Sequence, residues 1–371
     1  MDEITRRGDS GNQAGYVGEI AAIKHQQQQV ITAVQTYEGI IKLIAWFVEE
    51  DGFIRRTGDS SDLGEMGSSI SIAGEFGLLS TRYVTAMRSS EANLFLIGWN
   101  VNDEGTEILR LGDSGDLAGE VDLIKIIALE DFRYLTAVRT SSGRLKLILW
   151  RLNEDGSISR LSDSGNQAGE VTEISIARGS TDEEELVVTA VKTITGRIKL
   201  ISWRVANDGI DRLEESSNPG RFGSNVRILY MHGTNIITSI VGRLSFFLFR
   251  SRVFRIRSWW LNGSGNIEQR DNHYSFETIK RESDISVHFL PGNDFVISAH
   301  QTFDNDLKLV KWHVDSDFNR TISRIGDSGN QAGYVRLISM SEQLDDIVGV
   351  PRIITCVKTK SNRLMLIAWS T

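Results

Sequence analysis

The sequence predicts an all-β fold, a seven-bladed β-propeller with four-stranded antiparallel blades, on three observations. First, a tryptophan closes an apolar run seven times, at intervals of 51 to 57 residues. Second, four short β-type runs separated by turn residues fill each interval, which is the pattern of a propeller blade. Third, the chain holds 34 Gly but only 3 Pro, as expected where most residues are in hydrogen-bonded strands. The seven tryptophans are Trp46, Trp99, Trp150, Trp203, Trp260, Trp312 and Trp369.

Each repeat is predicted to contain four strands, which we call a to d in chain order. Around Trp150, the b run ends in the motif Thr-Ala-Val at 136–138 and the c run covers 145–150. A Gly-containing turn leads to the d run, and the Gly-rich loop 163–169 leads to the next a run at 171–176. The b and c runs are apolar on both faces, so we expect neighbouring blades to cover them.

The two ends of the chain are predicted to meet in one blade. The chain stops at Thr371, directly after a c strand, and the missing d strand is found at 4–9, near the amino terminus. Pairing these ends removes two open sheet edges. We therefore expect a single domain, residues 1–371, closed by the N-terminal strand.

Composition excludes several classes of protein. The formal net charge of −8 disfavours general nucleic-acid binding, and the single cysteine, Cys356, excludes an internal disulfide framework. No run approaches the roughly 20 apolar residues of a transmembrane helix, and the first residues lack the apolar core of a secretory signal. We expect a cytoplasmic protein with no transmembrane segment, no cofactor and no metal.

An Arg and an acidic residue recur together on the d strands. The pairs are Arg6/Asp9, Arg56/Asp59, Arg110/Asp113, Arg160/Asp163, Arg212/Glu215 and Arg324/Asp327. In the remaining copy both are lost, since Gln269 and Asn272 stand in their places. This joint loss predicts that Arg and carboxylate meet in space as a structural clamp between blades.

The loops that follow the d strands offer three chemical interpretations. Gly8-Asp9-Ser10-Gly11 resembles a protease nucleophile segment, but it recurs and no His accompanies each copy. The Asp, Ser and Asn oxygens suit Ca²⁺ only weakly, since each loop has one or two carboxylates. A multivalent glycan-binding lectin needs aromatic platforms, and only Tyr16 and Tyr334 lie nearby. Tight turns are the favoured interpretation.

The fifth repeat departs from the pattern. The b-strand hydroxyl residue and its Trp are 14 residues apart in six copies, whereas Thr238 and Trp260 are 22 apart, so the b–c hairpin gains eight residues. Between 232 and 267 there are five Arg and no acid. The segment 214–325 also holds 10 of the 15 Phe and five of the six His. Function on a repetitive scaffold is expected where the repeat fails.

Because b–c and d–a loops of a propeller emerge on one face, we expect a hydrophobic, Arg-lined cleft on the loop face of blades 5 and 6. The predicted ligand-binding residues are Phe246, Phe249, Arg250, Arg252, Phe254, Trp259, His273, Tyr274 and Phe276. If the cleft is catalytic, the candidates are His273, His300 and Glu277, with a His next to a carboxylate as general base. His25, in an a–b loop, is expected on a solvated face.

Three interpretations of the long hairpin stay open: plain core, a surface for a protein partner or membrane, and a pocket for an aromatic or amphiphilic small molecule. The favoured function is binding of a hydrophobic or aromatic ligand or protein partner. The alternatives are an enzyme acting on an amphiphilic aromatic substrate, by alkylation or cyclisation, and a lectin.

The repeated motifs carry a family resemblance over the whole chain. With Val-Thr-Ala-Val, Leu-Lys-Leu-Ile-x-Trp and Gly-Asp-Ser-Gly-Asn-Gln-Ala-Gly, the sequence resembles bacterial seven-bladed β-propellers. It also resembles the propeller domain of cyanobacterial enzymes that alkylate phenolic rings. That resemblance implies a hydrophobic ligand. In that family a calcium-binding domain precedes the propeller and shares the active site, and no segment here corresponds to it. No catalytic residue can be matched by position.

Overall fold

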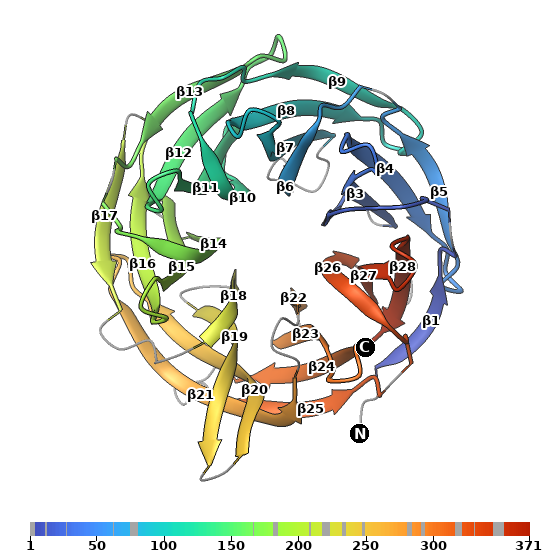
Figure 1. Ribbon diagram of the computed structural model, residues 1–371, viewed down its shortest axis with the longest axis vertical. Helices are drawn as coiled ribbons and strands as arrows, with labels where there is room; N and C mark the ends of the chain where they lie inside the picture. The colour runs from blue at the N-terminus through green and yellow to red at the C-terminus, as the bar shows by residue number, and fades with distance from the viewer. Residues whose placement is uncertain are drawn as a thin grey trace. The chain divides into compact units, whose positions relative to one another are not determined.

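The computed structural model describes most of the chain. It covers residues 4–371 except 12, 27, 62, 75–80, 166, 181–184, 208, 217–222, 232–234, 247–248, 280–283, 291–293, 316–320, 330 and 344–351. Within this part all regular structure is β, in seven antiparallel four-stranded sheets, and the protein is a seven-bladed β-propeller (Figure 1). The predicted fold class is thus confirmed.

The first four blades take their strands in chain order. Blade 1 holds β2 (Ile20–Lys24), β3 (Gln29–Gln35), β4 (Ile41–Val48) and β5 (Ile54–Asp59). Blade 2 holds β6 (Gly67–Gly74), β7 (Arg82–Ser89), β8 (Leu94–Val101) and β9 (Ile108–Asp113). Blade 3 holds β10 (Val121–Ala128), β11 (Arg133–Thr140), β12 (Leu145–Leu152) and β13 (Ile158–Asp163). Blade 4 holds β14 (Val171–Ser180), β15 (Glu185–Thr193), β16 (Ile198–Val205) and β17 (Ile210–Glu215).

Blades 5 and 6 also take their strands in chain order, whereas blade 7 combines both ends of the chain. Blade 5 holds β18 (Gly223–Tyr230), β19 (Asn235–Phe246), β20 (Phe249–Leu261) and β21 (Ile267–Thr278). Blade 6 holds β22 (Ile285–Leu290), β23 (Phe295–Gln301), β24 (Leu307–Val314) and β25 (Ile322–Asp327). Blade 7 holds β26 (Val335–Gln343), β27 (Arg352–Thr359), β28 (Leu364–Ser370) and β1 (Thr5–Asp9).

The N-terminal strand closes blade 7 as predicted. β1 pairs antiparallel with β28, and the register joins Thr5 to Ser370 and Arg6 to Trp369. By its internal contacts the chain divides into two compact units. One contains blades 7, 1, 2 and most of blade 3, and the other contains blades 4, 5 and 6. The expectation of a single domain over 1–371 stays a prediction.

The b and c strands form the core because both of their faces are covered. In blade 2, Val84, Leu96 and Trp99 are fully buried. Val84 and Leu96 pack into a cluster with Ile148 and Trp150 of blade 3, whereas Trp99 packs against blade 1 in a second cluster. This explains why these strands are apolar at successive positions and do not alternate with polar residues.

A buried hydrogen bond recurs in every blade. The indole Nε1 of each core tryptophan donates to a b-strand hydroxyl at 2.9–3.0 Å. Since the indole is buried, its donor needs an internal acceptor. In blade 6 the acceptor is Ser298, which shows that the hydroxyl, and not the threonine methyl, is the shared feature.

Removing this hydroxyl is expected to destabilise the protein. In Thr85→Val the Nε1 of Trp99, now 2.9 Å from Thr85 Oγ1, would be buried without an acceptor, at a cost of about 1–3 kcal/mol in the free energy of unfolding. Urea unfolding measures the effect. Thr85→Ser is the matched control, since it keeps the hydroxyl, and it should cost less. An equal loss in both variants would contradict the role of the hydrogen bond.

Candidate functional site

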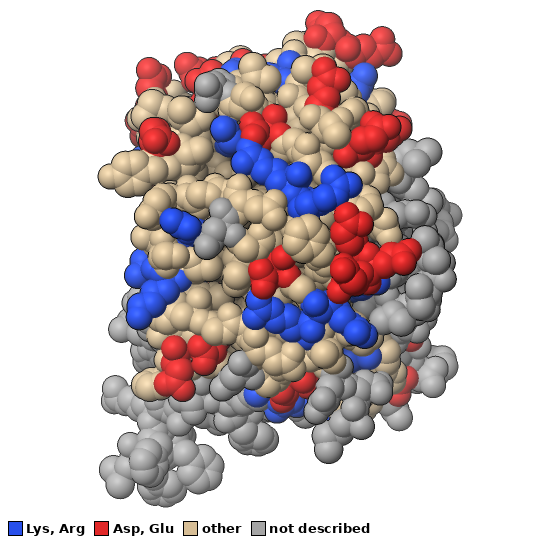
Figure 2. All heavy atoms as spheres, turned by 90° about the vertical axis from the view of Figure 1, so that its right-hand side faces the viewer, with Lys and Arg blue, Asp and Glu red and all other residues tan. Residues whose placement is uncertain are grey.

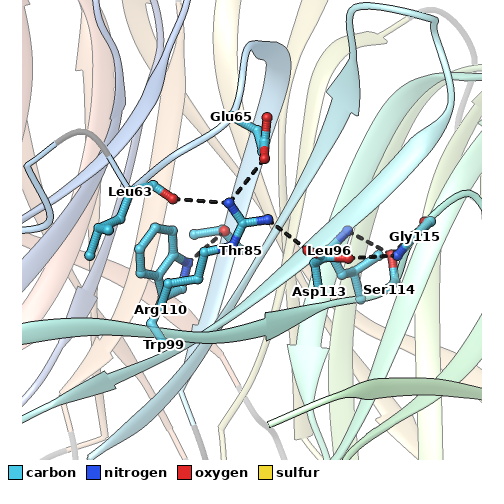
Figure 3. Close-up of polar contacts among 9 residues, drawn as sticks. All are labelled: Leu63, Glu65, Thr85, Leu96, Trp99, Arg110, Asp113, Ser114 and Gly115. Atoms are coloured by element: carbon cyan, nitrogen blue, oxygen red, sulfur yellow. Dashed lines mark hydrogen bonds and ion pairs between the residues drawn. The ribbon is translucent and has the colours of Figure 1, made fainter.

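The repeated Asp-Ser-Gly loops use their polar atoms to hold the backbone. Ser114 is 4% exposed; its Oγ accepts a hydrogen bond from Leu96 N at 3.0 Å and donates one to Gly115 O at 3.0 Å (Figure 3). Asp113 Oδ1 accepts from Gly115 N at 3.0 Å. The same Ser–Leu bond of 3.0 Å forms at Ser10–Leu366, Ser60–Leu43, Ser216–Leu200 and Ser328–Leu309. This geometry supports the tight-turn interpretation over a nucleophile.

In five blades the Arg and carboxylate of the d strand do meet, but within one strand, at Arg6–Asp9, Arg56–Asp59, Arg110–Asp113, Arg212–Glu215 and Arg324–Asp327. Arg110 Nη2 lies 2.7 Å from Asp113 Oδ2, three residues along β9. The contact between blades is made by Arg110 Nη1, which donates to Leu63 O at 3.1 Å and Glu65 Oε1 at 3.0 Å, in the preceding d–a loop (Figure 3). The expected Arg–carboxylate bond between blades is therefore corrected: the guanidinium joins its own carboxylate to the neighbouring loop.

The charges in this clamp support one another. Burial alone would lower the pKa of Arg110, but hydrogen bonds and charges from Glu65 and Asp113 raise it above its ordinary value. In four blades a c-strand Lys also contacts the same carboxylate, namely Lys42–Asp59, Lys146–Asp163, Lys199–Glu215 and Lys308–Asp327. On the side of the molecule that carries β5, basic and acidic residues accordingly lie next to one another (Figure 2).

The d strand of blade 5 replaces the clamp with a different contact. Gln269 lies opposite Trp259 in the register, as Arg56 lies opposite Trp46 in blade 1. Asp271 Oδ2 accepts a hydrogen bond from Ile322 N at 2.7 Å. Blade 5 thus holds the d strand of blade 6 through a carboxylate.

The b–c turns and the d–a loops lie together. In the unit with blades 1 and 2, backbone bridges join Ile40 to Met66 and Asn93 to Glu120. In the other unit a bridge joins Asp306 to Tyr334. Each bridge connects a b–c turn with the d–a loop of the same blade. The long hairpin of blade 5 therefore begins at this turn-and-loop edge.

That hairpin extends five residue pairs beyond the blade. In blade 4 the last pair of the b–c hairpin is Lys192 with Ile198, and the equivalent pair in blade 5 is Val241 with Phe254. Pairing then continues from Gly242–Val253 to Phe246–Phe249. At about 3.4 Å per residue this adds about 17 Å. We call residues 242–253 the arm; β19 and β20 carry it beyond the other strands of blade 5 (Figure 1).

The register corrects the position of the insertion. Trp259 Nε1 donates to Thr238 Oγ1 at 2.9 Å, and Trp259 lies opposite Ile236, so Trp259 and not Trp260 is the repeated tryptophan. The spacing to Thr238 is 21 residues, and the hairpin gains seven residues instead of eight. Trp260 is partly exposed, with the Arg270 guanidinium 5.0 Å from its ring centre.

Three of the predicted site residues lie in the core. Phe254 and His300 are fully buried and Trp259 is 3% exposed. The Phe254 ring stacks between His300 and Trp312, with centroid distances of 5.5 and 5.6 Å. The side chains of the others lie outside the described residues: Phe246, Phe249, Arg250, Arg252, His273, Tyr274, Phe276 and Glu277. Their roles stay predictions.

Sequence reasoning missed several buried polar residues. Arg257 is 6% exposed and stands two residues before Trp259, a position that holds apolar Ile148 in blade 3. Lys311 is 4% exposed, with its Nζ 4.2 Å from the Phe295 ring centre. Alignment on Trp259 would have revealed Arg257 as a charged residue at a core position.

The solvated surface expected for His25 is wrong. His25 is 5% exposed, with Nδ1 2.6 Å from Tyr83 Oη and Nε2 3.0 Å from Asn102 O. Both partners come from blade 2, so the a–b loop of blade 1 is held by its neighbour. The bonded ring links the two blades.

Two further tests concern ions and membranes. Among the described residues, no group of three or more His, Cys, Asp or Glu is placed to hold a metal ion. The same part of the chain contains no helix of the length and apolarity needed to cross a membrane.

Comparison with known proteins supports the fold. No family model and no curated protein matches the chain. Sqt1 of Saccharomyces cerevisiae is 9% identical, with a TM-score of 0.57 over 99% of both chains. A putative 6-phosphogluconolactonase from Bacteroides uniformis is 11% identical, with a TM-score of 0.56 over 87% of this chain and 90% of that one. The periplasmic gluconolactonase of Pseudomonas aeruginosa is 10% identical, with a TM-score of 0.55 over 93% of each. Such low identities support the propeller alone.

The clamp predicts a pH-dependent stability. Burial alone would raise the pKa of Asp327, but the hydrogen bond from Gly329 N and the charges of Lys308 and Arg324 lower it. A carboxyl with a depressed folded-state pKa stabilises the fold above its ordinary pKa of about 4, and this contribution is lost as the pH falls through the folded value. We therefore expect Asp327→Asn to unfold more easily than the wild type at neutral pH.

The difference should shrink as the pH falls from about 5 to about 3. Chemical unfolding at a series of pH values measures it. Asp304→Asn, at an exposed turn of the same blade, is the control and should show little change at any pH. A difference at Asp327 that is constant with pH would refute the electrostatic origin.

Proposed function

We propose that the protein is a binding propeller whose blade 5 arm engages a hydrophobic or aromatic ligand or protein partner that carries negative charge. The observation that carries this proposal is the backbone register, in which five residue pairs continue beyond the end of the blade. A blade needs no such extension to complete its sheet, as the short hairpins of the other blades demonstrate.

The composition of the arm favours an amphiphilic partner. Its sequence includes Phe246, Phe249, Arg250 and Arg252, and no acidic residue occurs from 232 through 267. The arm is therefore positively charged, whereas the whole chain has a net charge of −8. Aromatic residues supply apolar contact area, and guanidinium groups bind carboxylates, phosphates and phenolates.

The proposed cleft lies between the arm and the neighbouring elements. β21 runs beside β20, and the register places His273 opposite Ile256 and Tyr274 opposite Arg255. The b–c turns of the flanking blades expose apolar side chains: Ile194 is 63% and Phe303 is 67% exposed. Large exposed apolar side chains next to a charged arm are typical of an interaction surface. Because His300 is buried against Phe254, no catalytic role is proposed for it.

An exchange of turns tests this function. Replacing residues 242–253 with the blade 4 turn sequence 193–197 removes seven residues and restores the spacing of the other blades. Val241 and Phe254 would then pair as Lys192 and Ile198 do, so the melting temperature should be retained. The probe is 8-anilinonaphthalene-1-sulfonate, an aromatic anion whose fluorescence rises on binding. We expect saturable binding by the wild type and at least about tenfold weaker binding by the exchange variant.

A matched variant keeps the arm at full length. Arg250→Gln with Arg252→Gln should weaken binding of the sulfonate while leaving binding of its uncharged analogue, N-phenyl-1-naphthylamine, nearly unchanged. Unaltered sulfonate affinity in a well-folded exchange variant would refute the proposal.

A further inference from the structure

Among the described residues, blade 7 does not form the ion pair that two other blades form between their a and b strands. In blade 3, Arg139 of β11 pairs with Asp122 of β10, with 3.3 Å between nitrogen and oxygen. In blade 4, Lys192 of β15 pairs with Glu173 of β14 at 2.9 Å. In both blades a carboxylate on the a strand thus neutralises a cation on the b strand.

The register shows which residues take these positions in blade 7. In blade 3, Leu123 lies opposite Arg139, and Asp122 is the bulge residue between Val121 and Leu123. In blade 7, Leu337 lies opposite Lys358, and the bulge residue between Val335 and Leu337 is Arg336. Arg336 therefore stands where blade 3 has Asp122, and Lys358 stands where it has Arg139. An ion pair is replaced by two like charges.

A third cation and an aromatic ring lie beside this pair. Arg336 Nη1 donates to Asn362 Oδ1 at 2.9 Å, and Lys358 Nζ donates to Gly18 O at 3.0 Å. Arg363, which follows Asn362 in the sequence, has its guanidinium carbon 5.6 Å from the ring centre of Tyr16. Tyr16 is 56% exposed.

The same segments are fixed to one another by backbone bonds. Val17 N donates to Asn362 O at 2.8 Å, and Tyr16 forms a bridge with Arg363. Lys358 and Arg363 therefore contact the loop 16–18 directly, and Arg336 binds Asn362, whose backbone holds that loop.

The positive charge of this cluster is not balanced by the described residues. Among them, none of Arg336, Lys358 and Arg363 forms an ion pair with a carboxylate. Burial and the charge of Arg336 lower the pKa of Lys358, and Glu19 acts in the opposite direction. The Oε2 of Glu19 accepts a hydrogen bond from Ile70 N at 3.0 Å, so this carboxylate is shared with the backbone of blade 2. Lys358 thus feels the repulsion of Arg336 against the attraction of a single carboxylate, an arrangement that a bound anion would stabilise.

We propose that blade 7 carries a binding site for a small phosphate or sulfate monoester. Arg336, Lys358 and Arg363 bind the tetrahedral oxyanion, and the exposed face of Tyr16 packs against the ring that bears it. Guanidinium groups bind such oxyanions through paired, charge-assisted hydrogen bonds, and an ammonium group adds a point charge. This site is independent of the arm and of the function proposed for it.

Calorimetric titration at low ionic strength tests the site. The probes are phenyl phosphate, glucose 6-phosphate, inorganic phosphate and glucose. We expect one saturable site for at least one monoester and no binding of glucose. The stronger of the two monoesters identifies the ring as phenolic or as a sugar.

The decisive variant is Arg336→Asp, which recreates the charge arrangement of blade 3. It should weaken monoester binding at least about tenfold. Because it also removes a like-charge contact with Lys358, its melting temperature should equal or exceed that of the wild type. Loss of binding therefore cannot be attributed to unfolding.

Two further variants separate the parts of the site. Tyr16→Ala should weaken monoester binding by several-fold and leave inorganic phosphate within about twofold. Arg55→Asp makes the same charge change at an exposed position paired with Glu49 and should leave every probe unaffected.

Several results would overturn the proposal. They are the absence of saturable binding for all three charged probes, full affinity in Arg336→Asp, and an equal loss in Arg55→Asp, which would indicate a general effect of net charge. Monoester affinity that is unchanged in Tyr16→Ala would overturn the role of the ring.

Discussion

Burial of both faces of the middle strands is the constraint on which this propeller depends. A c strand such as β8 is covered on both sides, so Trp99 can reach no water and its indole donor must find an acceptor inside the blade. A hydroxyl 14 residues earlier, on the paired b strand, provides that acceptor. The spacing that makes the repeat visible in the sequence is therefore a consequence of a hydrogen-bond requirement.

The same constraint moves variation to the edges of the blades. The Asp-Ser-Gly loops are repeated because they satisfy c-strand backbone amides, as Ser114 does for Leu96. Where a blade lacks the clamp to the preceding loop, as at Gln269, its d strand makes a contact with the following blade instead: Ile322 N donates to Asp271. Turns and loops that make none of these contacts can gain residues or change charge without disrupting the core.

The fold was predictable because periodicity reports strand pairing directly. The regular recurrence of a tryptophan and the strand-like sequence of residues 4–9 were enough to predict the blades and the closure of the last one. The candidate site was less predictable for physical reasons. Trp259 and Trp260 are adjacent and equally apolar, and only the register distinguishes the one that bonds to Thr238.

Tertiary contacts determine whether His25 and Phe254 are buried or exposed. His25 lies in a polar loop sequence but is buried by Tyr83 and Asn102 of the neighbouring blade. Phe254 belongs to an Arg- and Phe-rich segment, yet it packs between His300 and Trp312. Composition located the unusual blade, but it could not divide that blade's apolar residues between core and surface.

The two departures from the repeat differ in what they require of the fold. The arm adds residues beyond Val241 and Phe254, and the core pairs beneath it keep the register of the other blades. In blade 7, by contrast, Arg336 stands at a bulge that blade 3 also has. Asp122 attracts Arg139 in blade 3, whereas Arg336 repels Lys358 in blade 7. The arm leaves the pairing of the core strands unchanged, whereas like charges on adjacent strands cost stability until a negative charge joins them. Residues that destabilise the free protein and are stabilised by an anion are the expected signature of an anion-binding site.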